Sequence, residues 1–323
     1  MPGIASIPPE ILRTRHRLSP LQINILFGRN IIEESRDDKA VALERVAGFL
    51  ELTDALTRAG VGFIPLKGPL LSERLYGDPT ARYSHDLDIL VREEDIANAY
   101  RVLAASGYIP LSPPLPESSG RRKKKLKYNH HISYIHPDRE QIVELHWRIM
   151  NRPWMGFSNI DGLLQDNLIE HEFAGRRFIV PAVELELLYL VIHGAAHRWG
   201  RLKWLADVHR LLEAKAFSET GFSDLTKILK AGRLVALCNE VLMEYFPKVK
   251  LLPCSARPSE YMLRSVRRAI ASESYHGPAT IAEILNNIRY ALSAYPGLGY
   301  KLKLAGTVIG NSLLSGRLSR VLD

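Results

Sequence analysis

The sequence contains little cysteine and no long apolar run, and each shortage excludes a class of protein. Only two residues are cysteines, Cys238 and Cys254, which are too few for a disulfide framework and lack metal-ligand spacing. No apolar run has the length of a bilayer span, and no basic region followed by an apolar one indicates an export signal. We therefore expect a protein of the reducing cytoplasm without a transmembrane segment.

The composition is that of a folded protein that contacts anions. Hydrophobic residues make up 46% of the 323-residue chain, which is enough to bury a sizeable core in two domains or lobes. The formal net charge of +8 favours an anionic partner. A nucleoside triphosphate and a nucleic acid both satisfy that preference, and the charge does not choose between them.

The most informative motif is a pair of aspartates at the start of an apolar strand, in the run RYSHDLDILV over residues 82–91. Asp86 and Asp88 share one face of this strand because side chains two apart point the same way, while Leu87 and Ile89 face the opposite layer. Two carboxylates about 5 Å apart repel by about 3 kcal/mol at an effective dielectric of roughly 20. A bound divalent cation would replace this repulsion with a net attraction. The alternative interpretation is that the two aspartates belong to a solvated turn.

A predicted strand and helix start lie upstream, in VGFIPLKGPLLSERLY over residues 61–76. Gly68 lets the backbone approach a ligand, and Pro69 suits the first position of a helix whose free amides attract an anion. Lys67 adds a point charge, and Arg82 offers a planar fork that matches phosphate oxygens. The pattern predicts a phosphate site, with an ordinary strand-to-helix turn as the alternative.

A third carboxylate lies on a predicted hairpin whose strands cover residues 131–136 and 141–147, with a turn at Pro137-Asp138-Arg139-Glu140. Glu144 shares one face of the second strand with Ile142 and His146. Glutamate is disfavoured within a strand unless it is solvated, paired or bound to a metal. Glu144 is therefore a candidate metal ligand, and an edge-strand residue facing water is the alternative.

Periodicity elsewhere predicts an α+β fold with two parts. Residues 1–150 combine these strands with helices, as a small mixed sheet flanked by helices, and residues 151–323 are mostly helical. After Trp154, a two-strand ribbon is predicted over 172–181. Helices are predicted over 18–26, 39–58, 93–106, 184–197 and 201–212.

As a set, these motifs resemble the nucleotidyltransferase superfamily that includes DNA polymerase beta, and within it the bacterial family described as uncharacterised nucleotidyltransferases. The Arg-x-x-x-Asp-x-Asp run is also similar to antibiotic nucleotidyltransferases that adenylylate aminoglycosides or lincosamides. The resemblance covers about residues 61–208. The family pattern of a Lys-Gly turn, an arginine four residues before D-x-D and a later glutamate is matched by Lys67-Gly68, Arg82, Asp86, Asp88 and Glu144.

The resemblance implies transfer of a nucleoside monophosphate from a nucleoside triphosphate to a hydroxyl acceptor, with release of pyrophosphate. The acceptor would be a small molecule, a protein or a tRNA, bound by the helical part. Two Mg²⁺ (or Mn²⁺) ions would be held by Asp86, Asp88 and Glu144. Lys67, Gly68 and Arg82 would bind the nucleotide. The chain departs from the superfamily at Pro69, where glycine or serine usually supplies an amide or a hydroxyl to a phosphate.

A basic run, Arg121 to Lys127, offers a second hypothesis. Such a run can grip a phosphate backbone, so the chain could instead be a non-catalytic nucleotide- or RNA-binding protein that uses the same fold. Blocks of like charge usually remain solvated, and the other interpretation is an exposed loop between a helix and a strand.

The helical part contains a histidine pair, His193 and His197, one helical turn apart. Such a pair can bind zinc, but no third ligand has suitable spacing in the sequence. The family resemblance extends through this segment. We expect His193 and His197, together with His146, Arg201 and Lys203, to line a substrate cleft.

Overall fold

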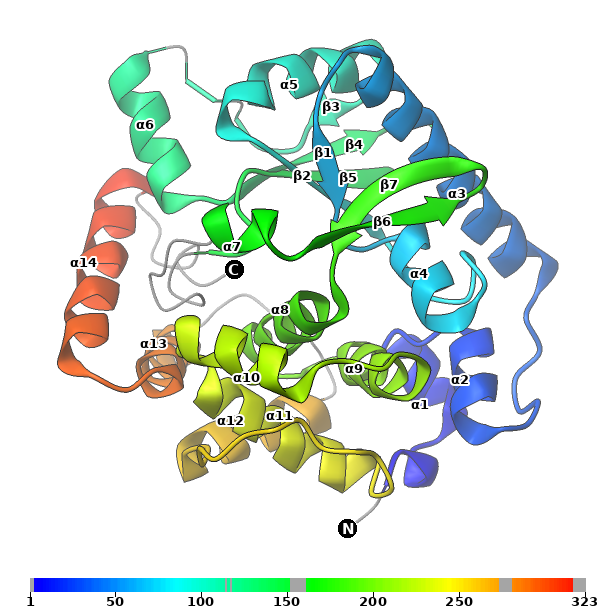
Figure 1. The fold of residues 1–323 in the computed structure, drawn as a ribbon, viewed down its shortest axis with the longest axis vertical. Coiled ribbons are helices and arrows are strands. Elements are labelled where there is room, and N and C mark those ends of the chain that lie inside the picture. Colours follow the sequence, from blue (N-terminus) through cyan, green and yellow to red (C-terminus); the bar gives the residue numbers. More distant parts are fainter. Residues whose placement is uncertain (1–2, 114, 117, 152–160, 273–280, 316–323) are drawn as a thin grey trace. The chain divides into compact units, whose positions relative to one another are not determined.

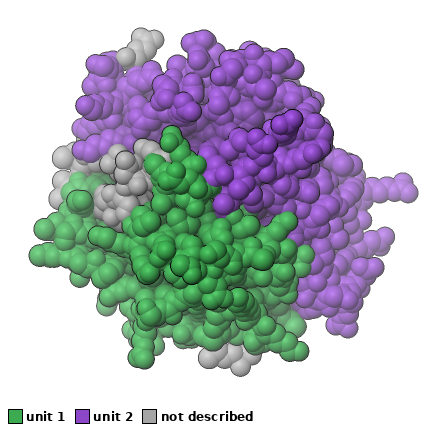
Figure 2. All heavy atoms as spheres, in the orientation of Figure 1, with its two compact units in different colours: residues 1–17, 150–167, 183–323 green, residues 18–149, 168–182 purple. Residues whose placement is uncertain are grey.

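The computed structural model describes residues 3–113, 115–116, 118–151, 161–272 and 281–315. The chain divides into two compact units (Figure 2). The sheet unit comprises residues 18–149 and 168–182, and the helical unit comprises residues 1–17, 150–167 and 183–323. The change of texture after Trp154 lies outside the described residues, and the division into residues 1–150 and 151–323 stays a prediction.

The sheet unit contains a mixed sheet with the strand order β1-β2-β5-β4-β3 among the described residues (Figure 1). Strands β2 and β5 are parallel, and the other neighbouring pairs are antiparallel. This confirms the predicted α+β class, the strand at the D-x-D motif and the later hairpin. The strands are β1 Phe63–Pro65, β2 Asp86–Val91, β3 Ile109–Pro110, β4 His131–His136 and β5 Gln141–His146.

One face of β2 and β5 is apolar because alternate residues of each strand are branched aliphatics. Leu87 and Ile89 of β2 and Val143 and Leu145 of β5 lie in one buried core cluster. Helices α3 (Arg36–Arg58) and α5 (Ile96–Ala105) contribute to the same cluster. Each fully buried aliphatic or aromatic side chain stabilises the fold by about 1.5–3 kcal/mol, so this face supplies much of the stability.

A two-stranded ribbon completes this core from a distant part of the sequence. It consists of β6 (Leu168–Phe173) and β7 (Arg176–Pro181), which confirms the predicted ribbon. Phe173 and Phe178 place their ring centroids 6.2 Å and 5.6 Å from that of Phe49 in α3. The ribbon is therefore part of the packing of the sheet unit.

The basic run is helical, which corrects the expectation of a loop at Arg121 to Lys127. Helix α6 spans Ser119–Tyr128. Lysine and arginine are good helix formers, and their long side chains keep their charges apart in solvent. The helix is also anchored, because Leu126 packs against the core and its carbonyl accepts a hydrogen bond from Trp147 Nε1 at 3.1 Å.

The helical unit is organised around α8 (Val183–Ala196), which is central because every residue from Leu185 to Ile192 is buried. Gly194 of α8 leaves room for the ring of buried Trp199, because a Cβ there would lie 2.1 Å from Trp199 Cζ3. Cys238 and Cys254 are free thiols. The helices of this unit are η1 Ile4–Ser6, α1 Pro9–Thr14, α7 Asp161–Gln165, α8 Val183–Ala196, α9 Leu202–Ala214, α10 Glu219–Ile228, α11 Gly232–Tyr245, α12 Glu260–Ala271, α13 Ile281–Ala294 and α14 Leu298–Ser315.

The remaining helices belong to the sheet unit: α2 Pro20–Phe27, α4 Pro69–Tyr76 and η2 Glu93–Asp95. Within the described ranges, none of the helices combines the length and the apolar character needed to cross a bilayer.

Candidate functional site

The face of β2 and β5 opposite the apolar core carries charged side chains. Asp88 of β2 and Glu144 of β5 are register partners across the parallel pair. The main chain holds this strand end in place, because Leu66 donates its N–H to the carbonyl of Asp88 at 2.9 Å. The alternation that buries Leu87 and Leu145 on one face of the sheet places the carboxylates of Asp88 and Glu144 next to each other on the other face. The period of two predicted the face of each side chain for each strand separately.

Two basic groups contact these carboxylates. His146 Nε2 lies 3.2 Å from Asp88 Oδ1 and 3.2 Å from Glu144 Oε2. Lys67 Nζ lies 3.3 Å from the same Asp88 oxygen. Asp88, His146 and Lys67 are only 1%, 3% and 6% exposed, so these charges are held away from water. Buried charges are tolerated when they are paired, and here the pairing joins two strands and the Lys-Gly turn.

The carboxylates determine the protonation of His146. Burial alone lowers the pKa of this imidazole, but its hydrogen bonds to Asp88 and Glu144 outweigh burial and raise the pKa to about 9. Burial acts to raise the pKa of Glu144, yet the hydrogen bond from His146 and the nearby His131 hold that pKa below its usual range. At neutral pH the site therefore contains the ionised carboxylate of Glu144 beside an imidazolium at His146.

Two further histidines adjoin His146. His131 of β4 faces His146 across the hairpin ladder, and its Nδ1 lies 2.9 Å from Nε2 of His130. His131 Nε2 also lies 3.7 Å from Glu144 Oε1. Burial and then the neighbouring imidazoles lower the pKa of His130 well below its ordinary value. Burial likewise lowers the pKa of His131, against the charge of Glu144.

The predicted Lys-Gly turn is present, with Gly68 immediately before α4. Gly68 has φ +88° and ψ −153°, and a Cβ there would lie 3.0 Å from Leu87 Cδ2, so the position requires glycine. Pro69 occupies the start of the helix, as predicted. The turn directs Lys67 to Asp88, beside the carboxylates.

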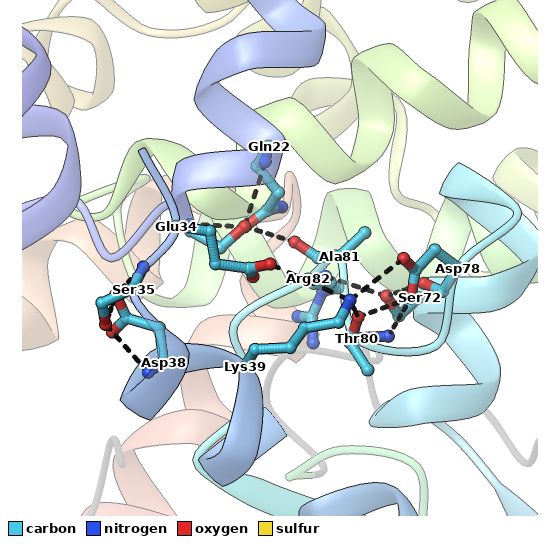
Figure 3. A network of polar contacts seen from close by, with 11 residues as sticks. Gln22, Glu34, Ser35, Asp38, Lys39, Ser72, Asp78, Thr80, Ala81 and Arg82 are labelled. Atoms are coloured by element: carbon cyan, nitrogen blue, oxygen red, sulfur yellow. Dashed lines mark hydrogen bonds and ion pairs between the residues drawn. The ribbon is translucent and has the colours of Figure 1, made fainter. Parts of the chain in front are cut away.

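Arg82 lies within the loop between α4 and β2, which polar contacts hold in place (Figure 3). Its backbone N–H donates to Ser72 Oγ at 2.8 Å, and Ser72 Oγ donates to the carbonyl of Asp78 at 2.7 Å. Lys39 Nζ donates to Thr80 Oγ1 at 2.6 Å and lies 3.5 Å from Asp78 Oδ2. The Arg82 residue is buried, four positions before Asp86. The loop leading into the D-x-D strand is therefore fixed at several points.

Two groups of candidate metal ligands occur among the described residues, and His146 belongs to both. In each group, one ligand atom per residue lies within 4.8 Å of the others. The first, which we call the oxygen-rich group, is Asp88, Glu144 and His146; the second, the nitrogen-rich group, is His130, His131 and His146. Asp86 is half-buried at the start of the same strand and lies outside both groups. The structure thus brings Asp88 and Glu144 together and adds His146 to them.

From the sequence, His146 was predicted to line a substrate cleft, and His130 and His131 were not predicted as site residues. The hairpin itself contained a signal for the pairing of His131 with His146. A four-residue turn at residues 137–140 pairs His136 with Gln141, and the same register pairs His131 with His146. Glu144 and His146 are also two apart on one strand face.

The other predicted cleft residues lie in the helical unit. His193 and His197 contact each other with ring centroids 4.7 Å apart, and His197 stacks on Trp204 at 4.8 Å. The guanidinium of Arg201 lies 6.0 Å from the Trp204 ring, and Lys203 is buried. Neither ligand group of the described residues includes this histidine pair. A cleft that these residues share with His146 stays a prediction.

The fold and the site together define an α+β protein with adjacent carboxylates and histidines at the polar face of a mixed sheet. A family model described as uncharacterised nucleotidyltransferase matches residues 33–247, which is more than half of the chain. The chain belongs to this family. The match includes β1 to β5 and all the candidate site residues named above. No curated protein matches the chain.

Proposed function

We propose that this protein transfers a nucleoside monophosphate from a nucleoside triphosphate to a hydroxyl acceptor, with Mg²⁺ or Mn²⁺ held by Asp86, Asp88 and Glu144. The observation that carries the proposal is the register of Asp88 with Glu144, on adjacent parallel strands and beside Lys67. Membership of the nucleotidyltransferase family supports the reaction class. The acceptor class, whether a small molecule, a protein or a tRNA, is left open.

The donor set fits a divalent cation. Carboxylate oxygens are the ligands that Mg²⁺ and Mn²⁺ prefer, and those of Asp88 and Glu144 lie within 4.8 Å of each other and of His146 Nε2. His146 lies between the two carboxylates, and Lys67 lies beside that of Asp88. Their positions show that these oxygens attract positive charge. Asp86, on the same strand face as Asp88, would complete the set.

The side chains around this cation site suit phosphoryl chemistry at the α-phosphorus. When bound, the cation would neutralise the triphosphate and acidify the acceptor hydroxyl. Glu144, which is ionised at neutral pH, would take the proton as the acceptor oxygen bonds to phosphorus and the bond to pyrophosphate breaks. Lys67 and Arg82 would stabilise charge on the phosphate oxygens, a task in which Pro69 cannot assist because it has no N–H.

Nucleotide binding is tested by thermal shift with Mg²⁺ and each nucleoside triphosphate in turn. At a ligand concentration 100-fold above Kd, binding stabilises the native state by about 2.7 kcal/mol, so at least one nucleotide should raise the Tm. Asp86→Ala/Asp88→Ala should abolish the rise. Glu94→Gln, which changes an exposed carboxylate of the same unit, should keep it. An undiminished rise in the double variant would remove the basis of the proposal.

Transfer itself is tested by incubating the protein with α-labelled triphosphates, Mg²⁺ and cell extract. The label should enter an acceptor fraction with wild-type protein and Glu94→Gln, and not with Glu144→Gln. Sorting the labelled product into small-molecule, protein and tRNA fractions identifies the acceptor class. Binding without label transfer in any fraction would instead support a non-catalytic nucleotide-binding protein.

The second candidate function, RNA binding without turnover, is favoured by the surface of α6. Arg121, Lys123, Lys124 and Lys127 are exposed on a helix that Leu126 attaches to the core. A basic helix face can follow a phosphate backbone. Changing these four residues to glutamine should weaken RNA retention and flatten its salt dependence if this function is present. An unchanged salt dependence would exclude α6 as the RNA-binding element.

A further inference from the structure

We propose that His130, His131 and His146 form a separate binding site for a transition-metal cation such as Zn²⁺, next to the oxygen-rich group. This site goes beyond the proposed nucleotide transfer, which assigns no role to His130 or His131. It also uses a different chemistry, because its donors are imidazole nitrogens and not carboxylate oxygens.

The backbone places the three imidazoles before any cation binds. His131 and His146 are register partners on the antiparallel strands β4 and β5. His130 is fixed just before β4, because its carbonyl accepts the N–H of Trp147 at 2.9 Å. The ring centroids lie 4.3 Å apart for His130 and His131, 5.4 Å for His130 and His146, and 5.0 Å for His131 and His146. A site on paired strands is preorganised, which favours binding.

The nitrogen atoms have suitable separations. In a tetrahedral site with Zn–N distances of about 2.0–2.1 Å, ligand atoms lie about 3.4 Å from one another. Here His131 Nδ1 and His130 Nε2 are 2.9 Å apart, and all three histidines offer a nitrogen within 4.8 Å of the others. Glu144 is not counted among these ligands, because its Oε1 lies 3.7 Å from His131 Nε2, the ring nitrogen that a cation bound at Nδ1 does not use.

The donor types favour a transition metal over Mg²⁺. Imidazole suits Zn²⁺, Cu²⁺, Fe²⁺ and Ni²⁺, whereas Mg²⁺ requires oxygen ligands in near-octahedral geometry. The oxygen-rich group and the nitrogen-rich group therefore differ in the cation they select, although they lie side by side. A hydrogen-bonded histidine network without any cation is the competing explanation, and titration with Co²⁺ separates the two.

His146 links the two groups. Because His146 belongs to both groups, a cation in the nitrogen-rich group changes the charge beside the oxygen-rich group and hence its affinity, and the change is reciprocal. We expect Zn²⁺ at the histidines to weaken Mg²⁺-nucleotide binding. The proposed function would then respond to the transition-metal supply, a consequence that rests on that function while the histidine site does not.

Co²⁺ is the direct probe, because its visible absorption reports nitrogen coordination and geometry. Metal-free protein is prepared with a chelator and titrated with Co²⁺, and Zn²⁺ is then added in competition and followed by calorimetry. Wild-type protein should bind Co²⁺ with intense tetrahedral-type bands, which Zn²⁺ displaces. His130→Gln/His131→Gln should weaken Co²⁺ binding at least tenfold. His136→Gln, at the other end of β4 and outside both ligand groups, should bind as wild type does.

Three outcomes would overturn the site. The first is no Co²⁺ binding by wild-type protein, which the hydrogen-bonded network without a cation predicts. The second is an unchanged Co²⁺ affinity in His130→Gln/His131→Gln, and the third is loss of Co²⁺ only in Asp88→Asn, which would place the cation in the oxygen-rich group. Circular dichroism checks that each variant is folded, and the single variant His130→Gln, which leaves both strands intact, gives a second measurement. The Mg²⁺-nucleotide thermal shift is recorded separately, so that failure of the proposed function is distinguishable from failure of the histidine site.

Discussion

Two buried histidines, one in each unit, show opposite electrostatic behaviour. His16 of the helical unit and His146 of the sheet unit are each 3% exposed. Burial, with the nearby Arg15, lowers the pKa of His16 to about 4, whereas the hydrogen bonds to Asp88 and Glu144 raise that of His146 to about 9. Equal burial thus leaves one imidazole neutral and the other charged, and the neighbouring carboxylates make the difference.

The contacts explain why one histidine is structural and the other belongs to a candidate site. His16 Nδ1 accepts the backbone N–H of Leu202 at 3.4 Å, so it joins α1 to the start of α9. Arg15 donates to the carbonyls of Gly200, Ala269 and Ser272 at 2.6 to 2.7 Å. His146 instead contacts side chains that carry charge and can exchange partners. A buried histidine therefore indicates a functional site only when its partners are themselves ionisable.

The largest expected effect is a loss of stability of the metal-free sheet unit at high pH. The pKa of His146 is higher in the folded state, about 9 against 6.5, so its contribution is fully present below pH 6.5 and is lost as pH rises through 9. The loss is on the order of 3 kcal/mol. Hydrogen exchange of β4 and β5 amides should show it, and His146→Gln should remove it. If the stability of wild-type protein and of His146→Gln decreased equally steeply with rising pH, this assignment would be contradicted.

The helical unit should respond in the opposite direction, with an effect of similar size. The pKa of His16 is lower in the folded state, about 4 against 6.5, so the unfolded chain binds more protons and stability falls as pH decreases from 6.5 to 4. We expect a loss on the order of 3 kcal/mol, as for His146. Hydrogen exchange of α9 amides measures it, with His16→Gln as the reference. If both units lost stability in the same direction, the comparison would not hold.

Gly68→Ala tests the turn that directs Lys67 toward the carboxylates. Alanine at φ +88° is strained, and its Cβ would lie 3.0 Å from Leu87 Cδ2. We expect a decrease of about 1 to 2 kcal/mol in the free energy of unfolding, measured by urea titration. Gly77→Ala is the matched control, because Gly77 also has positive φ but a Cβ there meets nothing within 4 Å. If Gly77→Ala lowered the free energy of unfolding more than Gly68→Ala does, the steric argument would be refuted.

The smallest expected effect concerns the charge next to His16. Arg15→Met removes a cation that lowers the pKa of His16, so the pKa should rise by about half a pH unit to one pH unit in an NMR titration. Arg15→Lys keeps the charge while losing the planar fork, so it should destabilise the unit without this rise. A similar pKa rise in both variants would show that packing, and not charge, sets the value.

Local pattern was sufficient to predict most elements of the sheet. Alternation in residues 86–91 and 141–147 and the turn at 137–140 predicted β2, β4, β5 and the faces of their side chains. The parallel pairing of β2 with β5 is not a local property, because the two strands are far apart in sequence, and it is this pairing that brings Glu144 to Asp88. The sequence could therefore name both residues as candidates without fixing their contact.

The errors have physical causes of the same kind. The like charges of Arg121 to Lys127 suggested a loop, but the helix propensity of these residues and the attachment of Leu126 to the core decide the outcome. His130 was overlooked because it lies outside a regular strand and acquires its importance only from the hairpin register. Long-range pairing, which local propensity does not encode, accounts for this part of the candidate site.

The discontinuity of the sheet unit has a consequence for how the protein is made. The aromatic contacts of Phe49 with Phe173 and Phe178 can form only after those two residues are translated, more than a hundred residues later. During synthesis from the N-terminus, the nascent sheet therefore emerges from the ribosome with an aromatic patch uncovered. We expect a nascent chain that is stalled before residue 168 to bind holding chaperones. A chain whose synthesis has passed residue 182, with the ribbon outside the ribosome, should dissociate from them.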